Sequence, residues 1–320
     1  MGLHESIHLG ENVSLISRST EGSVYLLQDA TGEGRMTHYE VFPGVHLLYH
    51  DFRMDRCYSH FKPIAPVFCI DHCRDGRLEW EMSDGSSFFM GAGDMQLNSR
   101  ARHGGMFQLP LGYYRGITVS IFTAEASGPL SNVLDGFNVD IHALRAKFCR
   151  SIRPFVIRAR LHIEHIFAEL YAVPEEIRGP FLKIKVLELL LFLSAMEVPP
   201  HAEEYVYFGK EQVEKTKAIM ALITSAPEKH YTLEELSARF QFPVASMTKC
   251  FKGVYGTPIY AYMKTYRINA AAMKLRKTKD SITAIALQTG YENAGKFSAA
   301  FKSVLGQTPS DYRKSVSQMD

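Results

Sequence analysis

The stretch Phe251-Lys252-Gly253-Val254-Tyr255-Gly256-Thr257-Pro258 returns, with one inserted residue, as Phe301-Lys302-Ser303-Val304-Leu305-Gly306-Gln307-Thr308-Pro309. An internal repeat of this kind indicates one supersecondary unit that is used twice. Each copy follows a short apolar-periodic helix and a break, which is the arrangement of a helix-turn-helix unit. The sequence therefore predicts two helix-turn-helix units, at about residues 232–256 and 281–306, and favours a protein that binds DNA.

Charge is unevenly distributed along the chain. Residues 210–320 contain 17 lysines and arginines against 9 acidic residues, a net charge of +8. Residues 1–209 contain 19 basic and 25 acidic residues, a net charge of −6. A basic segment on an otherwise acidic chain is typical of a nucleic-acid-binding module.

Length and composition describe an ordinary globular protein. With 320 residues and 46% hydrophobic residues, the chain has material for two domains, each with its own core. The N-terminus lacks the pattern of a signal peptide, and the longest apolar stretch, residues 186–193, falls far short of a membrane span. The five cysteines lack framework spacing, which favours reduced thiols. We therefore expect a cytoplasmic protein that has no membrane partner.

The N-terminal part has a β-rich pattern. From about residue 14 to residue 122, short alternating runs are separated by glycine, proline and Asp-Gly pairs, which predicts a small antiparallel barrel or sandwich. The pairs Asp75-Gly76 and Asp84-Gly85 each predict a hairpin turn. Helices are expected at 161–170 and 181–196, followed by a linker at 197–209. The predicted fold is α+β with two domains: residues 1–196, β-rich with C-terminal helices, and residues 210–320, all-α.

The C-terminal residues resemble a known family. The pattern Ile282-x-x-Ile285-Ala286-x-x-x-Gly290-Tyr291, then Phe297-x-x-x-Phe301-Lys302 and Gly306-x-Thr308-Pro309-x-x-Tyr312-Arg313, is similar to the C-terminal signature of the AraC/XylS transcription regulators. The resemblance covers about residues 211–313. It implies two helix-turn-helix subdomains joined by a linker helix that contains Tyr262, Arg267, Ala272 and Leu275, and each recognition helix then enters one of two adjacent major-groove segments.

The same resemblance implies a role for the N-terminal half. In that family the N-terminal domain commonly binds an effector, dimerises, or does both, and its β-rich pattern here is similar to a cupin-like barrel. The resemblance thus implies an effector-responsive, homodimeric regulator whose partners are double-stranded DNA, an unknown small molecule and RNA polymerase. Activation is the expected direction of control, and no enzymatic activity is expected.

Helical spacing divides each recognition helix into two faces. In the first, Met247, Phe251 and Val254 are expected to face the core, and in the second Phe297, Ala300 and Phe301. The residues left outward are the predicted DNA contacts: Ala245, Thr248, Lys249, Lys252, Ala294, Lys296, Ser298 and Lys302. Lysines suit phosphates, whereas Thr248 and Lys249 suit base edges.

The second recognition helix carries small outward residues. Because Ala294, Gly295 and Ala299 cannot form bidentate hydrogen bonds with base edges, we expect the second unit to bind mainly phosphates. The first unit is then expected to supply most of the sequence specificity.

A pocket for an effector is expected among aromatic residues of the barrel. The candidate lining residues are Trp80, Tyr113 and Tyr114, with His60 or Arg115 as polar anchors. Phe88 and Phe89 belong to the same group. The alternative is that these aromatic side chains fill the core of the barrel, which gives a ligand-free regulator controlled by abundance or by a protein partner.

The helix around Leu187 is apolar on nearly every side. Such a helix must be covered on all faces, either by its own domain or by a partner. A dimer interface at Leu187, Leu190 and Leu191 is one interpretation, and core packing is the other.

A metal or redox site is a possible interpretation of the group Cys57, His60, Cys69, His72 and Cys73. These residues lack metal-ligand spacing, so no metal and no cofactor are expected. A metal-dependent cupin enzyme is the alternative function. It requires a cluster of histidine and carboxylate ligands, which the scattered residues His38, His46, His50, His60, His72 and His103 do not indicate.

Overall fold

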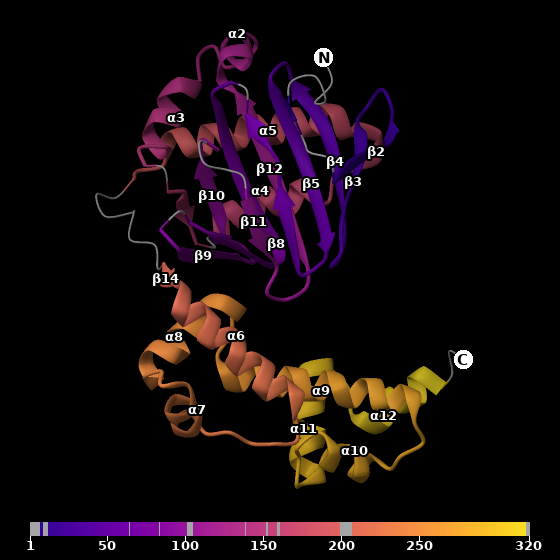
Figure 1. The fold of residues 1–320 in the computed structure, drawn as a ribbon. Helices are drawn as coiled ribbons and strands as arrows, with labels where there is room; N and C mark the ends of the chain where they lie inside the picture. Colours follow the sequence, from indigo (N-terminus) through magenta and orange to yellow (C-terminus); the bar gives the residue numbers. More distant parts are fainter. Residues whose placement is uncertain are drawn as a thin grey trace. The chain divides into compact units, whose positions relative to one another are not determined.

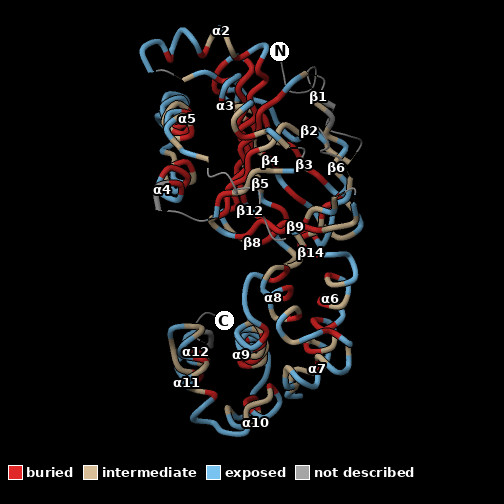
Figure 2. Tube along the Cα trace, turned by 90° about the vertical axis from the view of Figure 1, so that its left-hand side faces the viewer, coloured by how far each residue is buried: buried red, intermediate tan, exposed pale blue. Residues whose placement is uncertain are grey.

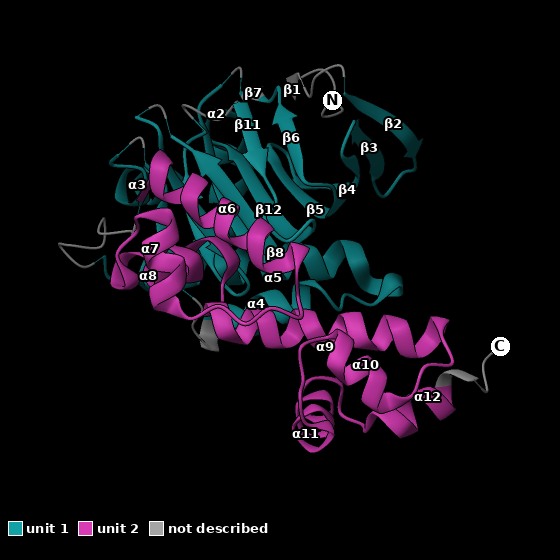
Figure 3. Ribbon diagram, turned by 60° about the horizontal axis from the view of Figure 1, so that its bottom comes forward, with its two compact units in different colours: residues 1–207 teal, residues 208–320 magenta. Residues whose placement is uncertain are grey.

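The computed structural model in Figure 1 describes residues 7–8, 12–63, 65–82, 84–100, 105–137, 139–151, 153–158, 161–198 and 207–317. The chain divides into two compact units, residues 1–207 and residues 208–320, which are coloured separately in Figure 3. This division lies within the segment 197–209 that the sequence predicts as a linker. Residues 199–206 of that segment lie outside the described residues.

The N-terminal unit is built on a large antiparallel sheet. Its strands lie in the order β13 (Phe155–Ile157), β10 (Met95–Asn98), β8 (Val67–Glu81), β12 (Tyr114–Phe122), β5 (Val45–Arg53), β4 (Gly32–Phe42), β3 (Ser23–Asp29) and β2 (Val13–Arg18). Three further strands extend the far half of β8: β9 (Ser86–Gly91), β11 (Gly105–Gln108) and β6 (Arg56–Ser59). Two short strands, β1 (Ile7–His8) and β7 (Lys62–Pro63), pair with each other, and β14 (Phe208–Gly209) begins the second unit.

Strand β8 takes part in two sheets, and this curves the domain. Its first half pairs with β10 and β12, so that Ile70 lies opposite both Leu97 and Val119. Its second half pairs with β9 and β11. The strand bends near Gly76, which has φ +84°, and a Cβ there would lie 2.3 Å from the Tyr113 carbonyl oxygen. A left-handed residue at a bend is suited to glycine.

The expected fold class is confirmed, with one correction of detail. The N-terminal sheet is antiparallel and forms a half-barrel, and the C-terminal unit is helical. The pair Asp84-Gly85 lies in the turn between β8 and β9, as predicted. The prediction of a hairpin turn at Asp75-Gly76 is wrong, because these residues lie inside β8 and bend the strand between its two sheets.

Helices cover one face of the sheet. They are α2 (Thr123–Val133), α3 (Ile141–Phe148), α4 (Leu161–Leu170), η1 (Glu175–Ile177) and α5 (Arg178–Ala195), and Figure 1 shows α4 and α5 running behind the strands. Strand residues such as Leu47 and Val119 form one buried cluster with Phe167 of α4 and Leu190 of α5. Figure 2 shows the buried positions concentrated along the strands of this sheet.

The opposite face of the sheet is concave and encloses a second cluster. Because side chains alternate along a strand, Leu47 and Tyr49 of β5 pack toward the helices, whereas His50 and Phe52 point into the half-barrel. This second cluster includes Phe107 and Tyr114. The sheet therefore has a face that is filled by helices and a face that leaves room for a cavity.

The C-terminal unit contains seven helices among its described residues. They are α6 (Lys210–Ser225), α7 (Leu233–Phe240), α8 (Val244–Tyr255), α9 (Ile259–Lys277), α10 (Ile282–Gln288), α11 (Ala294–Leu305) and α12 (Pro309–Ser317). Helices α8 and α11 hold the repeated motif, and each is followed directly by a glycine in the left-handed conformation: Gly256 with φ +81° and Gly306 with φ +78°. Glycine is the favoured residue at this position because it has no Cβ.

Two phenylalanines form the centre of the second helix-turn-helix unit. Phe297 and Phe301 are fully buried and pack with Ile268 and Leu275 of α9. We predict that Phe301→Ala lowers the free energy of unfolding of the C-terminal unit by about 3–5 kcal/mol, because it leaves a cavity in a close-packed core. Chemical denaturation followed by circular dichroism measures this change. The neighbouring exposed residue provides the control, since Lys302→Ala is expected to stay within about 0.5 kcal/mol of the parent; equal effects of the two changes would contradict the packing.

Candidate functional site

The first helix-turn-helix unit is positioned by caps at its turns. The Thr232 hydroxyl oxygen accepts the Glu235 N–H at 3.1 Å, and the Glu235 carboxylate accepts the Thr232 N–H at 2.9 Å. This is the capping box that begins α7. Helix α7 ends at Phe240, the next residue, Gln241, turns the chain with a φ of +47°, and α8 begins directly after Pro243.

Helix α8 separates into the two expected faces. Met247, Phe251 and Val254 are fully buried, whereas Lys249 and Lys252 are exposed. Ala245 is also exposed, and Thr248 is half-buried. The Thr248 hydroxyl donates to the Val244 carbonyl oxygen at 2.8 Å, so its methyl group and remaining lone pairs are what it presents outward.

Helix α11 has a similar construction. The Asn293 side chain accepts the backbone N–H groups of Gly295 at 2.8 Å and of Lys296 at 3.1 Å, which caps the helix. Of the remaining predicted contacts on this helix, Ala294, Lys296 and Lys302 are exposed and Ser298 is half-buried. Ala300, which the pattern placed inward, is half-buried against the core. The structure thus brings lysines to the outer side of both α8 and α11.

Arg267, in the middle of α9, links the two helix-turn-helix units of the C-terminal domain. Its Nε donates to the Pro227 carbonyl oxygen at 2.7 Å and its Nη2 to the Lys229 carbonyl oxygen at 2.8 Å. The His230 Nε2 lies 2.6 Å from the Gly290 carbonyl oxygen and must donate to it, so the Nδ1 accepts from Arg267 at 3.2 Å. The loop before α7 and the turn after α10 are therefore joined through one guanidinium and one imidazole.

The N-terminal half-barrel contains a cavity of about 130 Å³. Trp80 and Tyr114, two of the predicted pocket residues, line it. The other three lie elsewhere and are not among its lining residues: Tyr113 is exposed, His60 is exposed, and Arg115 pairs with Asp75 at 2.7 Å. Phe88 and Phe89 are buried in the core, as the filled-barrel alternative expects for those two residues.

A buried ion pair stands at the polar end of the cavity. Asp71 is 2% exposed, and its carboxylate accepts hydrogen bonds from Arg100, Thr118, Gln96 and Asn98. Arg100 has a positive φ of 52°, which is uncommon for a residue other than glycine. Sequence reasoning missed this group. The signal available was a charged residue, Asp71, within the apolar strand segment 67–73, because a buried charge requires a partner.

A hydrogen-bond relay fixes the state of His50 in the cavity wall. The Thr118 hydroxyl donates to Asp71 at 2.7 Å, so its oxygen accepts from the His50 Nε2 at 2.9 Å. Burial lowers the pKa of His50 to about 4. His50 is therefore neutral at pH 7 and carries its proton on Nε2.

The cysteines and histidines that raised the question of metal binding are dispersed. Cys57, Cys69 and Cys73 are buried, and burial raises the pKa of each thiol above its usual range. His72 stacks on Phe167 with ring centroids 4.0 Å apart. Among the described residues, no three histidine, cysteine, aspartate or glutamate side chains come together in a way that could hold a metal ion. His103 lies outside the described residues.

The residues of the predicted dimer interface lie on different sides of α5. Leu190 is fully buried in the core of its own domain, and Leu187 is half-buried. Leu191 is 41% exposed and Ile184 is 61% exposed. Ile184, Leu187 and Leu191 follow helical spacing and share one face, which leaves an apolar stripe along the helix.

Buried histidines predict a pH dependence of stability. Burial lowers the pKa of His38, His46, His50 and His72 from 6.5 to about 4. The unfolded chain thus binds more protons between these values, so the stabilising contribution is complete above pH 6.5 and is lost as the pH falls toward 4. We expect the N-terminal unit to unfold at a lower denaturant concentration at pH 5 than at pH 7, with the unfolding midpoint measured by Trp80 fluorescence. His72→Phe should reduce this fall, and the exposed-site control His165→Gln should not; an unchanged midpoint would contradict the account.

Comparison with known proteins identifies the kind of domain that the C-terminal unit contains. Residues 236–315 match the family described as a helix-turn-helix domain. The chain is 27% identical over 123 residues to the HTH-type transcriptional activator RhaR of Mannheimia succiniciproducens, covering 38% of this chain and 45% of that protein. It is 28% identical over 133 residues to the HTH-type transcriptional regulator MtrA of Neisseria gonorrhoeae, covering 42% of this chain and 44% of that protein. The aligned regions span less than half the length of either relative.

A solved structure of a transcriptional regulator with an AraC-type DNA-binding domain, from Chromobacterium violaceum, is 22% identical and covers 33% of this chain and 96% of that chain, with a TM-score of 0.31. The sequence matches confirm the resemblance on which the C-terminal prediction depends: this region is an AraC-type helix-turn-helix domain. Within the described residues, none of the helices has the length and apolar character that crossing a membrane requires.

Proposed function

We propose that this chain is a sequence-specific, DNA-binding transcription regulator. The observation that carries the proposal is the pair of helices α8 and α11, which occupy equivalent places in a repeated unit and each present lysines outward. A positively charged helix at the second position of a helix-turn-helix unit is suited to the major groove of DNA. The basic net charge of residues 210–320 supports the same partner.

The length of α9 suits two adjacent binding segments. A helix of 19 residues is about 28 Å long, which is close to the ~34 Å of one DNA turn. Helix α9 contacts α8 and α11, so it holds the two recognition helices apart on one scaffold. We propose that each of them enters one of two successive major-groove segments on the same face of the duplex.

We propose that α8 makes most of the contacts with base edges and that α11 mainly contacts phosphates. On α8, the Thr248 methyl group and the Lys249 ammonium group are suited to base edges, and Lys252 to phosphate. On α11, Lys296 and Lys302 are suited to phosphate, while Ala294 and its small neighbours offer no bidentate hydrogen bond. Specificity then comes mainly from the first unit.

The N-terminal unit is proposed to sense a small-molecule effector in its cavity. Trp80 and Tyr114 line this cavity together with the pair Asp71 and Arg100, an arrangement of apolar walls and a few fixed polar groups that is typical of ligand sites. Ligand binding then alters how the C-terminal domain engages DNA. Activation through contact with RNA polymerase, in the cytoplasm, is the proposed outcome.

Salt titration of DNA binding tests the central proposal. Purified protein is titrated against DNA from upstream of its own coding region, over a range of salt concentrations. Each lysine that contacts a phosphate contributes about one unit to the slope of log affinity against log salt. We therefore expect Lys296→Ala to lower the slope by about 1 without changing base preference. Thr248→Ala should relax base preference and leave the slope unchanged.

Lys183→Ala, an exposed lysine of α5, is the control and should bind as the parent does. Weak, sequence-blind binding by the parent, with and without effector, would contradict the proposed function. Equal changes in base preference from Thr248→Ala and Lys296→Ala would contradict the division of work between α8 and α11.

Homodimerisation is proposed through the apolar stripe of α5. Leu191→Lys places a charge on the stripe without entering the core, and we expect it to shift the protein from dimer to monomer in size-exclusion chromatography with light scattering. Leu190→Lys is a poorer test, because it places a charge in the core of the domain and prevents folding. Lys249→Ala, an exposed lysine of the C-terminal unit, should leave the dimer intact; a dimer that survives Leu191→Lys would contradict this interface.

A further inference from the structure

The cavity of the N-terminal half-barrel has a size, a polarity and a charge that restrict its ligand. We infer that it binds an uncharged single-ring aromatic molecule that carries one hydroxyl group, of which phenol is the simplest example. This inference rests on the proposed effector role of the cavity and specifies its chemistry.

The size of the cavity admits one ring. Its volume is about 130 Å³, and an apolar cavity of about 150 Å³ is known to hold a benzene molecule. Tyr58 lines the cavity and is 47% exposed, so it marks the side at which the cavity meets solvent. Fused rings and long acyl chains exceed this volume and would have to extend through that opening into solvent.

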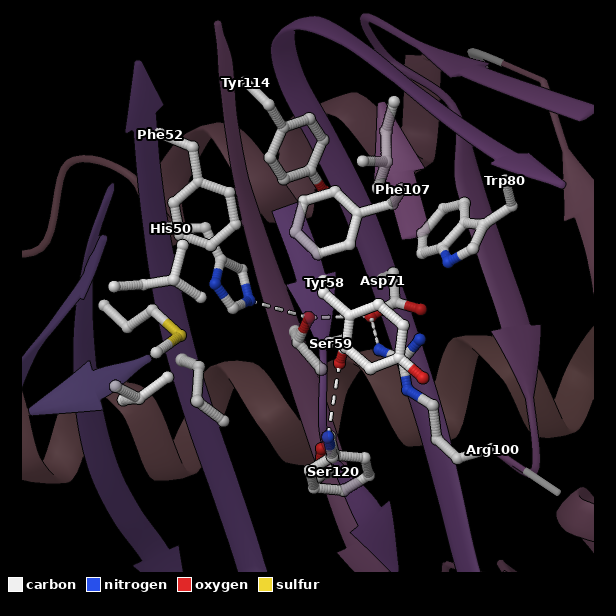
Figure 4. Close-up of a pocket in the computed structure, with 17 residues that line it drawn as sticks. His50, Phe52, Tyr58, Ser59, Asp71, Trp80, Arg100, Phe107, Tyr114 and Ser120 are labelled. Carbon is white, nitrogen blue, oxygen red and sulfur yellow. Dashed lines mark hydrogen bonds and ion pairs between the residues drawn. The ribbon is translucent and has the colours of Figure 1, made fainter. Parts of the chain in front are cut away.

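The walls are suited to an aromatic ring. Figure 4 shows the rings of Phe52, Phe107, Tyr114 and Trp80 in the upper part of the cavity, with Asp71, Arg100 and Ser120 below them. Trp80 is held in place by stacking on Phe88, with ring centroids 5.3 Å apart. Aromatic pairs of this kind add to the free energy of burying apolar surface. A sugar, whose hydroxyl groups each need a partner, is poorly suited to walls that are mostly apolar.

The charge of the cavity is already balanced. Asp71 and Arg100 form an ion pair that is almost completely buried. The four hydrogen bonds to Asp71 occupy both of its carboxylate oxygens. His50 is neutral, as argued above. A carboxylate or an ammonium ligand would therefore bring a charge that the cavity wall does not balance, and it would lose part of its hydration on binding, which is costly.

Ser120 is the residue that we assign to the ligand hydroxyl. It lines the cavity and is 5% exposed. Its hydroxyl lies 3.4 Å from the Cys69 sulfur, and sulfur is a weak hydrogen-bond partner. Thr118, in contrast, both donates to Asp71 and accepts from His50. A ligand hydroxyl beside Ser120 therefore gives the Ser120 side chain a stronger hydrogen-bond partner than the Cys69 thiol does.

The single tryptophan of the chain provides a direct measurement. Trp80 lines the cavity, so its fluorescence reports on the ligand. The full-length protein is titrated with phenol, toluene, benzoate and benzylamine, with excitation at the red edge of tryptophan absorption. We expect a saturable change with phenol, weaker binding of toluene, and binding of benzoate and benzylamine that is weaker than that of phenol by at least about tenfold. Benzoate or benzylamine that binds as tightly as phenol would overturn the argument from charge.

A serine substitution separates the hydroxyl group from the ring. Ser120→Ala should weaken the binding of phenol to the level of toluene and leave toluene unchanged, whereas Ser127→Ala, outside the cavity, should leave both unchanged. If neither phenol nor toluene alters Trp80 fluorescence, the inference about the ligand is wrong. Because this assay contains no DNA, its failure is separate from failure of the DNA-binding proposal, which the salt titration tests.

Discussion

Helix α9 is the element on which the arrangement of the C-terminal domain depends. Ile259 and Met263 are buried near its start. Ile268 and Leu275 are buried farther along, where they belong to the core of the second helix-turn-helix unit. One rigid helix therefore contributes to both units, and its rise of ~1.5 Å per residue sets their separation. A flexible linker of equal length would leave the two recognition helices without a fixed spacing.

Arg267 strengthens this constraint by joining loops that lie far apart in the sequence. Its guanidinium holds the carbonyl groups of Pro227 and Lys229, and His230 continues the connection to Gly290. Hydrogen bonds that involve a charged donor are stronger than those between neutral groups. Helix α9 sets the distance between the two helix-turn-helix units, and this network restrains their rotation about the helix axis.

The C-terminal fold could be predicted almost completely from the sequence because its signals are local. The capping residues Thr232 and Ser281 and the terminating glycines Gly256 and Gly306 each act within a few residues of the helix ends that they define. The repeat then supplied the arrangement of the units. The connection from Arg267 to His230 spans 37 residues, so no local pattern indicated it.

The N-terminal domain was predictable in class but not in detail, because its decisive contacts are distant in sequence. Asp71 finds its partner in Arg100, and the polar end of the cavity is built from that pair. An Asp-Gly pair is suited to a hairpin turn or to a bend within a strand. The bend forms at Gly76 because β8 pairs with β12 up to this residue and with β9 after it. Likewise, the all-apolar pattern of α5 does not distinguish Leu190, which faces the sheet, from Leu191, which faces away.

The most direct test of the account is a footprint of the full-length protein on its operator. Methylation protection of guanines, combined with hydroxyl-radical cleavage of the backbone, measures which groove segments the protein covers. We predict two protected major-groove segments on one face of the DNA, about one helical turn apart, because α9 fixes the spacing of α8 and α11. Protection of a single segment per protein chain, or of segments on opposite faces of the duplex, would contradict it.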